Sequence, residues 1–158
     1  MTKINSYLSL IRFYNPIGFW LLLWPGLWGL FLSNNFNIEN FTIVVLGSFL
    51  TRSLGCAIND FLDKDFDKNV ERTKSRPIAS KDLSLSEAGI FIVILASICI
   101  FLLMQTNPFT IKLVSYFAIP MIIFYPLMKR FLAMPQLFLG ATFGSVSYTH
   151  LRAHETTN

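Results

Sequence analysis

The sequence predicts an all-α protein, a multi-span transmembrane helical bundle with about five spans in 158 residues. Of its residues, 53% are hydrophobic and only 14% are charged, whereas a soluble domain carries about 25% charged residues. The charges lie between long apolar runs, and the mean hydropathy is +0.53. The net charge is +4, but the basic residues do not gather on one face. We therefore expect the lipid bilayer, and no nucleic acid, as a partner.

Five apolar runs are candidates for the membrane spans. A helix needs roughly 20 apolar residues to cross the hydrocarbon core. No charge lies between Arg12 and Glu39, Arg52 alone interrupts the second run, and Asn107 with Pro108 marks the expected end of the third. The runs cover residues 16–32, 40–59, 88–111, 113–128 and 131–146.

Lys and Arg residues alternate between the segments that join these runs. The N-terminus carries Lys3 and Arg12, the loop 33–40 carries neither type, and the loop between the second and third runs carries six. Only Lys112 follows the third run, while Lys129 and Arg130 follow the fourth. Because positive residues gather in cytoplasmic loops, the pattern predicts a cytoplasmic N-terminus.

Residues 145–158 differ from the rest of the chain. They turn polar before the fifth run is long enough to cross a membrane, and they hold both histidines. We therefore expect two segments. Residues 1–144 form a membrane domain, and residues 145–158 are an artefact or a disordered tail that takes no part in the site.

Acidic residues cluster directly after the second run. Six of the nine acidic residues are Asp60, Asp63, Asp65, Asp67, Glu71 and Asp82. An α-helix turns about 100° per residue, so a helix that continues from Arg52 through this segment points Asp65 away from one shared face. That face carries Asn59, Asp60, Asp63 and Asp67.

Such a face is suited to a divalent cation. Neighbouring carboxylates repel one another unless a cation neutralises them, and Mg²⁺ takes oxygen ligands that it shares between carboxylates and substrate phosphates. Arg72, Lys74 and Arg76 follow in the chain and are suited to phosphate oxygens. The pattern favours a magnesium–diphosphate site. The alternative is a solvated loop whose charges only set the topology.

Two arginines and three tryptophans lie within or beside the first two spans. Arg52 is costly inside a membrane, so it either pairs with a carboxylate near Asp60 or binds an anionic substrate. Arg12 either binds substrate or extends its side chain to the membrane surface. The tryptophans form one stripe on the first span, which is typical of packing or of an interface anchor: Trp20, Trp24 and Trp28.

Four stretches of the chain occur in a familiar order. They are 12–28 (RFYNPIG, then LLLWPGLW), 52–67 (which ends in NDxxDxxxD), 70–77 (VERTKSRP) and 125–140 (YPLMKR, then PQLFLG). With these stretches the chain resembles the intramembrane aromatic prenyltransferase family, most closely its 4-hydroxybenzoate polyprenyltransferases. The resemblance covers about residues 4–144.

The resemblance implies a helical fold of about nine spans in a bacterial inner membrane. It implies an enzyme of ubiquinone biosynthesis that uses Mg²⁺ to transfer a polyprenyl group from polyprenyl diphosphate to the ring of 4-hydroxybenzoate. The implied metal ligands are Asn59, Asp63 and Asp67, with Asp60 beside them. The implied catalytic residues are Asp63, Asp67 and Arg72. The implied substrate-binding residues are Arg12 and Arg52 for the aromatic carboxylate, Arg72, Arg76, Lys129 and Arg130 for the diphosphate, and Asn15.

The chain departs from the family pattern in one respect. After Asp82 it holds only two acidic residues, Glu87 and Glu155, and no second acidic motif. We therefore expect this chain to be an inactive N-terminal half of the enzyme. Two alternatives remain: a related prenyltransferase acting on haem, chlorophyllide or a naphthoate, and a non-catalytic membrane protein that binds divalent cations.

Overall fold

Every regular element in the part of the chain that the structure describes is a helix. The computed structural model describes residues 2–32, 36–118 and 120. No strand occurs in these ranges, which confirms the all-α prediction for them. The elements are α1 (Lys3–Leu10), α2 (Ile17–Leu32), α3 (Ile38–Leu62), α4 (Lys64–Asp67), α5 (Leu85–Met104), α6 (Pro108–Leu113) and a π-helix over Val114–Ala118.

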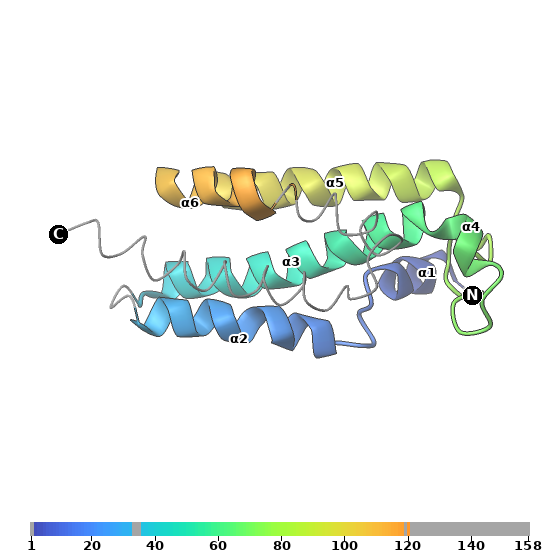
Figure 1. Ribbon diagram of the computed structural model, residues 1–158, viewed down its shortest axis with the longest axis horizontal. Helices are drawn as coiled ribbons and strands as arrows, with labels where there is room; N and C mark the ends of the chain where they lie inside the picture. Colours follow the sequence, from blue (N-terminus) through green and yellow to red (C-terminus); the bar gives the residue numbers. More distant parts are fainter. Residues whose placement is uncertain (1, 33–35, 119, 121–158) are drawn as a thin grey trace.

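The long helices lie side by side, with α3 in the middle. α3 packs against α2 on one side and against α5 on the other (Figure 1). α3 and α5 are long and apolar enough to cross a membrane, and α2 is a shorter apolar helix. The first three predicted runs therefore coincide with apolar helices, of which α3 and α5 have the length of a membrane span. The fifth predicted span and most of the fourth lie outside the described residues.

The third apolar run ends where the sequence predicts. The side chain of Asn107 accepts a hydrogen bond from the backbone N–H of Thr110 at 2.7 Å, and Pro108 occupies the first turn of α6. A proline is tolerated there because the first N–H groups of a helix have no intrahelical partner. The run is therefore divided, since α5 ends at Met104 and α6 begins at Pro108. Asn37 caps α3 in the same way.

Large apolar side chains face outward along the helices. The tryptophan stripe of α2 is exposed, with relative exposures of 49% for Trp20, 53% for Trp24 and 64% for Trp28. α5 likewise exposes Ile90, Val93 and Ile94. A surface of this kind is costly in water and compatible with lipid. The outward stripe is the arrangement expected of helices that span a membrane.

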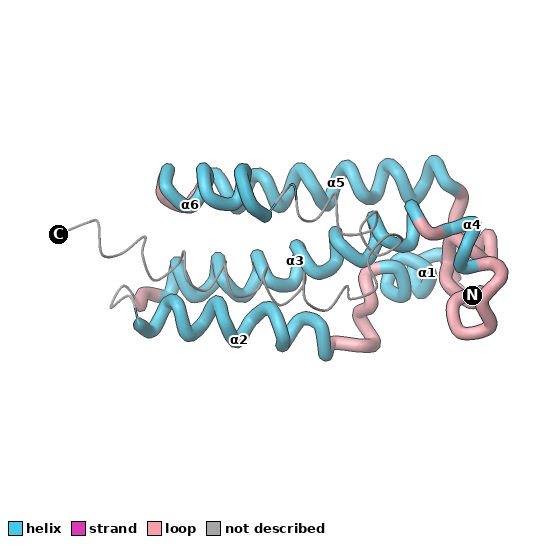
Figure 2. Tube along the Cα trace, viewed as in Figure 1, coloured by secondary structure: helices cyan, strands magenta, loops and turns pink. Residues whose placement is uncertain are grey.

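A cluster of buried apolar residues lies at one end of the bundle, where α1 and the loop after α4 meet α3 and α5. Its residues are Leu10, Ala57, Ile78, Leu83 and Ala88. Figure 2 shows the long loop, in pink, at this end. By burying Ile78 and Leu83, the core holds the loop between α4 and α5 against α3. It is at this end that acidic and basic side chains from separate elements come together.

Candidate functional site

Arg12 lies in the turn that ends α1. Its φ is 57°, a left-handed conformation that glycine usually supplies after a helix. The backbone N–H of Arg12 donates to the carbonyl of Ser9 at 3.1 Å, and that of Phe13 donates to Leu8 at 3.0 Å. These two bonds form the Schellman pattern, which satisfies the last carbonyls of the helix. The turn carries the Arg12 side chain toward α3.

Asp60, in the last turn of α3, receives the Arg12 side chain. The Nη2 atom of Arg12 donates to Oδ1 of Asp60 at 2.8 Å and to Oδ2 at 3.2 Å. Asp60 is only 1% exposed. A buried carboxylate is strongly unfavourable unless it is paired and hydrogen-bonded. The pair therefore ties the end of α1 to the end of α3 and does not leave Arg12 at the membrane surface.

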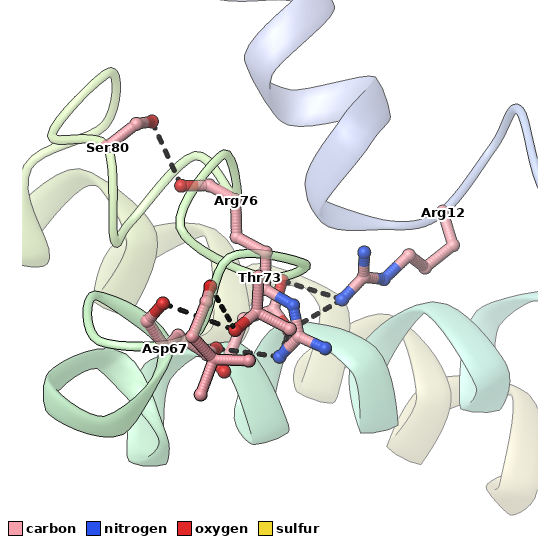
Figure 3. Close-up of polar contacts among 7 residues, drawn as sticks. Arg12, Asp67, Thr73, Arg76 and Ser80 are labelled. Carbon is pink, nitrogen blue, oxygen red and sulfur yellow. Dashed lines mark hydrogen bonds and ion pairs between the residues drawn. The ribbon is translucent and has the colours of Figure 1, made fainter.

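Arg76 joins two carboxylates. Its Nη1 atom lies 3.0 Å from Oδ1 of Asp60 and 2.6 Å from Oδ2 of Asp67. Its side chain is 17% exposed. Figure 3 shows that the two arginines come from separate elements: Arg12 extends from the turn after α1 and Arg76 from the loop after α4. Two buried carboxylates thus share one cation supplied by the chain itself, and we call Arg12, Asp60, Asp67 and Arg76 the four-residue cluster.

The loop that carries Arg76 is held by its own hydrogen bonds. The hydroxyl of Thr73, a buried residue, donates to the backbone carbonyl of Asp67 at 3.2 Å. The hydroxyl of Ser80 donates to the carbonyl of Arg76 at 2.9 Å (Figure 3). Thr73 is not among the site residues predicted from the sequence, although its place between Arg72 and Arg76 in VERTKSRP is a usable signal. These bonds fold the loop back onto α4 and bring Arg76 to Asp67.

The prediction of one continuous helix from Arg52 to Asp67 is wrong. α3 ends at Leu62, Asp63 follows with φ −91° and ψ 6°, and α4 begins at Lys64. The backbone spacing nevertheless survives the break. Asp63 N–H donates to the carbonyl of Asn59 at 2.9 Å, and Asp67 N–H donates to the carbonyl of Asp63 at 2.8 Å. Helical i to i+4 bonds therefore lie on both sides of the break.

The predicted division of the acidic residues is confirmed despite that break. Asp60, Asp63 and Asp67 are all buried. The side chain of Asp65 is 71% exposed and pairs with Lys68 at 3.0 Å. The hydrogen bond from Lys68 holds the pKa of the Asp65 carboxyl below its usual range. Asp65 thus faces solvent, whereas Asp60, Asp63 and Asp67 face the interior.

Arg52 does not pair with Asp60. Among the described residues it takes part in no ion pair, and its Nε atom is buried without a hydrogen-bond partner. Its guanidinium lies against Gly18, near the start of α2. A Cβ added to Gly18 would lie 2.6 Å from Nη2 of Arg52. Of the two uses predicted for Arg52, pairing with a carboxylate near Asp60 is therefore wrong.

The remaining predicted residues are not drawn into the four-residue cluster. Asn15 and Arg72 are exposed, and Asn59 is half-buried. Lys129 and Arg130 lie outside the described residues. Sequence reasoning missed Gly18 as a neighbour of Arg52, and its only local signal is its position in the NPIG motif.

No group of three or more His, Cys, Asp or Glu side chains is arranged as a metal site in the ranges that the structure covers. Two of the predicted ligands, Asp60 and Asp67, instead contact Arg76. The donors at this end are carboxylate and amide oxygens, which is the ligand type that Mg²⁺ takes. The donor chemistry fits a magnesium site, while the charges of Asp60 and Asp67 are balanced in this structure by Arg12 and Arg76. The assignment of Asn59, Asp63 and Asp67 as ligands stays a prediction.

The chain has relatives of known family and name. Residues 22–149 match the UbiA prenyltransferase family. The 4-hydroxybenzoate octaprenyltransferase of Polynucleobacter asymbioticus is 46% identical over 90% of this chain and 50% of its own length. Its namesake from Vibrio atlanticus is 44% identical over 90% and 50%, and that from Pseudomonas aeruginosa is 42% identical over 87% and 47%. The chain thus spans about half the length of the curated relatives it matches. No solved structure matches it.

Proposed function

Since the chain belongs to the UbiA prenyltransferase family, we propose that it carries the diphosphate-binding half of an integral membrane prenyltransferase. The enzyme transfers a polyprenyl group from polyprenyl diphosphate to the ring of 4-hydroxybenzoate, in ubiquinone biosynthesis. One observation carries the proposal from the structure: two buried carboxylates, Asp60 and Asp67, converge on a single cation at the end where the basic loop folds back. The names of the relatives support the choice of acceptor.

Mg²⁺ is the proposed cofactor, held by Asn59, Asp63 and Asp67. When bound, it would neutralise the negative charge of the diphosphate. Asp60 has a different role here from the one expected of it. It already holds Arg12 and Arg76, so we assign it to the positioning of these arginines and not to the metal.

Basic residues then stabilise the departing diphosphate. The allylic C–O bond breaks, and negative charge grows on the diphosphate oxygens. Arginines fixed beside those oxygens stabilise the transition state more than the ground state. The ring carbon next to the phenol carbon forms the new C–C bond and afterwards loses its proton. The diphosphate-binding residues are Arg72, Arg76, Lys129 and Arg130.

The carboxylate of 4-hydroxybenzoate falls to Arg52. Of the two arginines predicted for this role, Arg12 is engaged by Asp60, whereas Arg52 has no ion pair among the described residues. An unpaired cation within a span is a functional group by default. Arg52 lies in α3, the helix that also carries Asn59 and Asp60. The acceptor and the diphosphate would therefore be held by one helix.

The proposed location is the bacterial inner membrane, with the N-terminus and the loop after α4 in the cytoplasm. Both segments are rich in Lys and Arg, as cytoplasmic segments are. Polyprenyl diphosphate carries a long apolar chain, and the exposed apolar side chains of α2 and α5 are suited to contact it. Its charged end would then meet the four-residue cluster at the cytoplasmic boundary.

The test is calorimetric binding of geranyl diphosphate to the detergent-purified protein, with and without Mg²⁺. We expect binding that requires Mg²⁺ and is weakened at least tenfold in Asp67→Asn but not in Asp65→Asn. Cation binding that is indifferent to diphosphate would instead favour a non-catalytic cation-binding protein. In a full-length form, turnover with haem, chlorophyllide or a naphthoate in place of 4-hydroxybenzoate would point to a related prenyltransferase.

A further inference from the structure

We propose that Gly18 is a positioning residue for the aromatic acceptor. Because Gly18 has no side chain, it leaves the space in which the guanidinium of Arg52 lies, and it thereby orients Arg52 toward the acceptor's carboxylate. The inference rests on the proposed function, which assigns that carboxylate to Arg52. Gly18 lies near the start of α2, and Arg52 lies in the middle of α3. The two helices pack against each other.

The contact between them is close. A Cβ atom built on Gly18 would lie 2.5 Å from Cζ and 2.6 Å from Nη2 of Arg52. Non-bonded carbon atoms normally approach to about 3.5–4.0 Å. Any side chain at position 18 would therefore have to displace the guanidinium. The atoms in the way belong to the end of a flexible side chain, so the helices themselves can stay in place.

Space, and not backbone freedom, accounts for glycine at this position. No glycine in the described ranges has a positive φ, so Gly18 does not supply a conformation that other residues avoid. Glycine also loses more backbone entropy on folding than alanine does, so it brings no advantage of its own to the first turn of α2. The close approach of Arg52 is the feature that offsets this disadvantage.

Arg52 itself has the features of an anion-binding residue. Its Nε atom is buried and has no hydrogen-bond partner in the described part of the chain. Arg12 and Arg76, by contrast, share the carboxylates of Asp60 and Asp67. A carboxylate is the natural partner of a guanidinium, since both are planar and can form two parallel hydrogen bonds. A small shift of such a pair is costly because the acceptor ring must be aligned for attack.

Two other glycines separate this role from ordinary helix packing. Gly26 also lies on α2 and faces α3, but a Cβ there would meet only Cγ1 of Val44, at 2.9 Å. A Cβ on Gly47, in α3, would meet nothing within 4 Å. Gly26→Ala thus disturbs the packing of α2 on α3 without reaching Arg52. Gly47→Ala disturbs neither.

The experiment compares these variants in a full-length enzyme that joins this chain to the remaining half of a relative. The KM values for 4-hydroxybenzoate and for polyprenyl diphosphate are measured separately. We expect Gly18→Ala to raise the KM for 4-hydroxybenzoate about tenfold or more, the effect of losing a hydrogen bond to a charged group. The KM for the diphosphate should change less than about twofold. Gly26→Ala and Gly47→Ala should leave both values within about twofold.

A double variant shows whether Gly18 acts through Arg52. Arg52→Ala removes the guanidinium, so Gly18→Ala should add nothing to the KM for 4-hydroxybenzoate in that background. The double variant has no guanidinium to displace, and it should therefore fold at least as well as Arg52→Ala even if Gly18→Ala alone folds poorly.

Three outcomes overturn the inference about Gly18, and one of them also rejects the assignment of the acceptor's carboxylate to Arg52. Equal effects of Gly18→Ala and Gly26→Ala on both KM values would show that Gly18 only packs the helices. A raised KM for 4-hydroxybenzoate in Arg52→Ala but not in Gly18→Ala would reject the role of Gly18 and keep that of Arg52. An unchanged KM in Arg52→Ala would reject the proposed acceptor site as well.

Discussion

Arg12 occupies a backbone position that glycine usually takes at the end of a helix. A left-handed conformation costs an L-residue about 1–2 kcal/mol, and φ at Arg12 is 57°. The strain is offset by the ion pair with buried Asp60, which lies 48 positions further along the chain. A residue that is unfavourable locally is thus retained for a distant contact, as strained residues at functional sites often are.

Arg12→Gly and Arg12→Ala should differ in stability, although both lose the ion pair. Glycine relieves the left-handed strain and alanine keeps it, so Arg12→Gly should be the more stable by about 1 kcal/mol. Both should be less stable than the unmodified protein, because Asp60 keeps only Arg76. Thermal unfolding in detergent measures the difference. As a control, Lys81→Gly should be stabilising, because Lys81 has φ 66° and forms no ion pair within the described ranges.

Asp63→Asn and Asp65→Asn remove the same charge from one short segment and should have very different effects on turnover. In the full-length enzyme, loss of a charged magnesium ligand should cost roughly 4 kcal/mol of transition-state stabilisation, a fall in kcat on the order of 10³. Asp65 is exposed and paired with Lys68, so its variant should lose less than about tenfold. Equal losses in the two variants would contradict a specific metal site.

At the scale of the element, the break between α3 and α4 shapes the acidic segment. The residues from Asn59 to Asp67 include no glycine or proline, so the local sequence contains no residue type that predicts the break. Asp63 adopts φ −91° and ψ 6°, a sparsely populated conformation found in turns and in many active sites. The break turns α4 out of line with α3 while the backbone bonds at Asp63 continue. Arg76 can then reach both Asp60 and Asp67.

The start of α5 has a reciprocal cap that can be tested alone. The side chain of Ser84 accepts from the backbone N–H of Glu87 at 3.2 Å, and the carboxylate of Glu87 accepts from the backbone N–H of Ser84 at 3.0 Å. Ser84→Ala should lower the free energy of unfolding by about 1 kcal/mol. Ser75→Ala, in the exposed loop, should stay within about 0.5 kcal/mol of the unmodified protein. A chemical unfolding series in detergent gives both values.

At the scale of the whole molecule, the helices place polar segments at two opposite ends. α1, α4 and the basic loop gather at one end, while the last turn of α2, the start of α3 and the junction of α5 with α6 lie at the other (Figure 1). This arrangement agrees with the alternation of Lys and Arg along the chain. The segment 64–84 is rich in both residue types, and residues 33–40 include neither.

Cysteine labelling should assign the two ends to the two sides of the membrane. After replacement of Cys56 and Cys99, Asn35→Cys and Gln105→Cys should react with an impermeant maleimide added from the periplasm. Ser75→Cys should react only once the membrane is opened. Gln105 is preferred to Asn107 because the Asn107 side chain caps α6. The reverse pattern of labelling would invert the proposed orientation.

The sequence by itself determined the helical class, the first three apolar helices and the position of the acidic segment. These depend on local properties: apolar run length sets a span, Asn107 and Pro108 divide α5 from α6, and the spacing of Asp65 from Asp63 and Asp67 turns it outward. Only the tertiary structure decided which arginine meets which carboxylate. Arg12, Arg52 and Arg76 are chemically equivalent in a sequence. Their partners depend on how the turn after α1 and the loop after α4 approach α3, and on the one glycine of α2 that leaves room for Arg52.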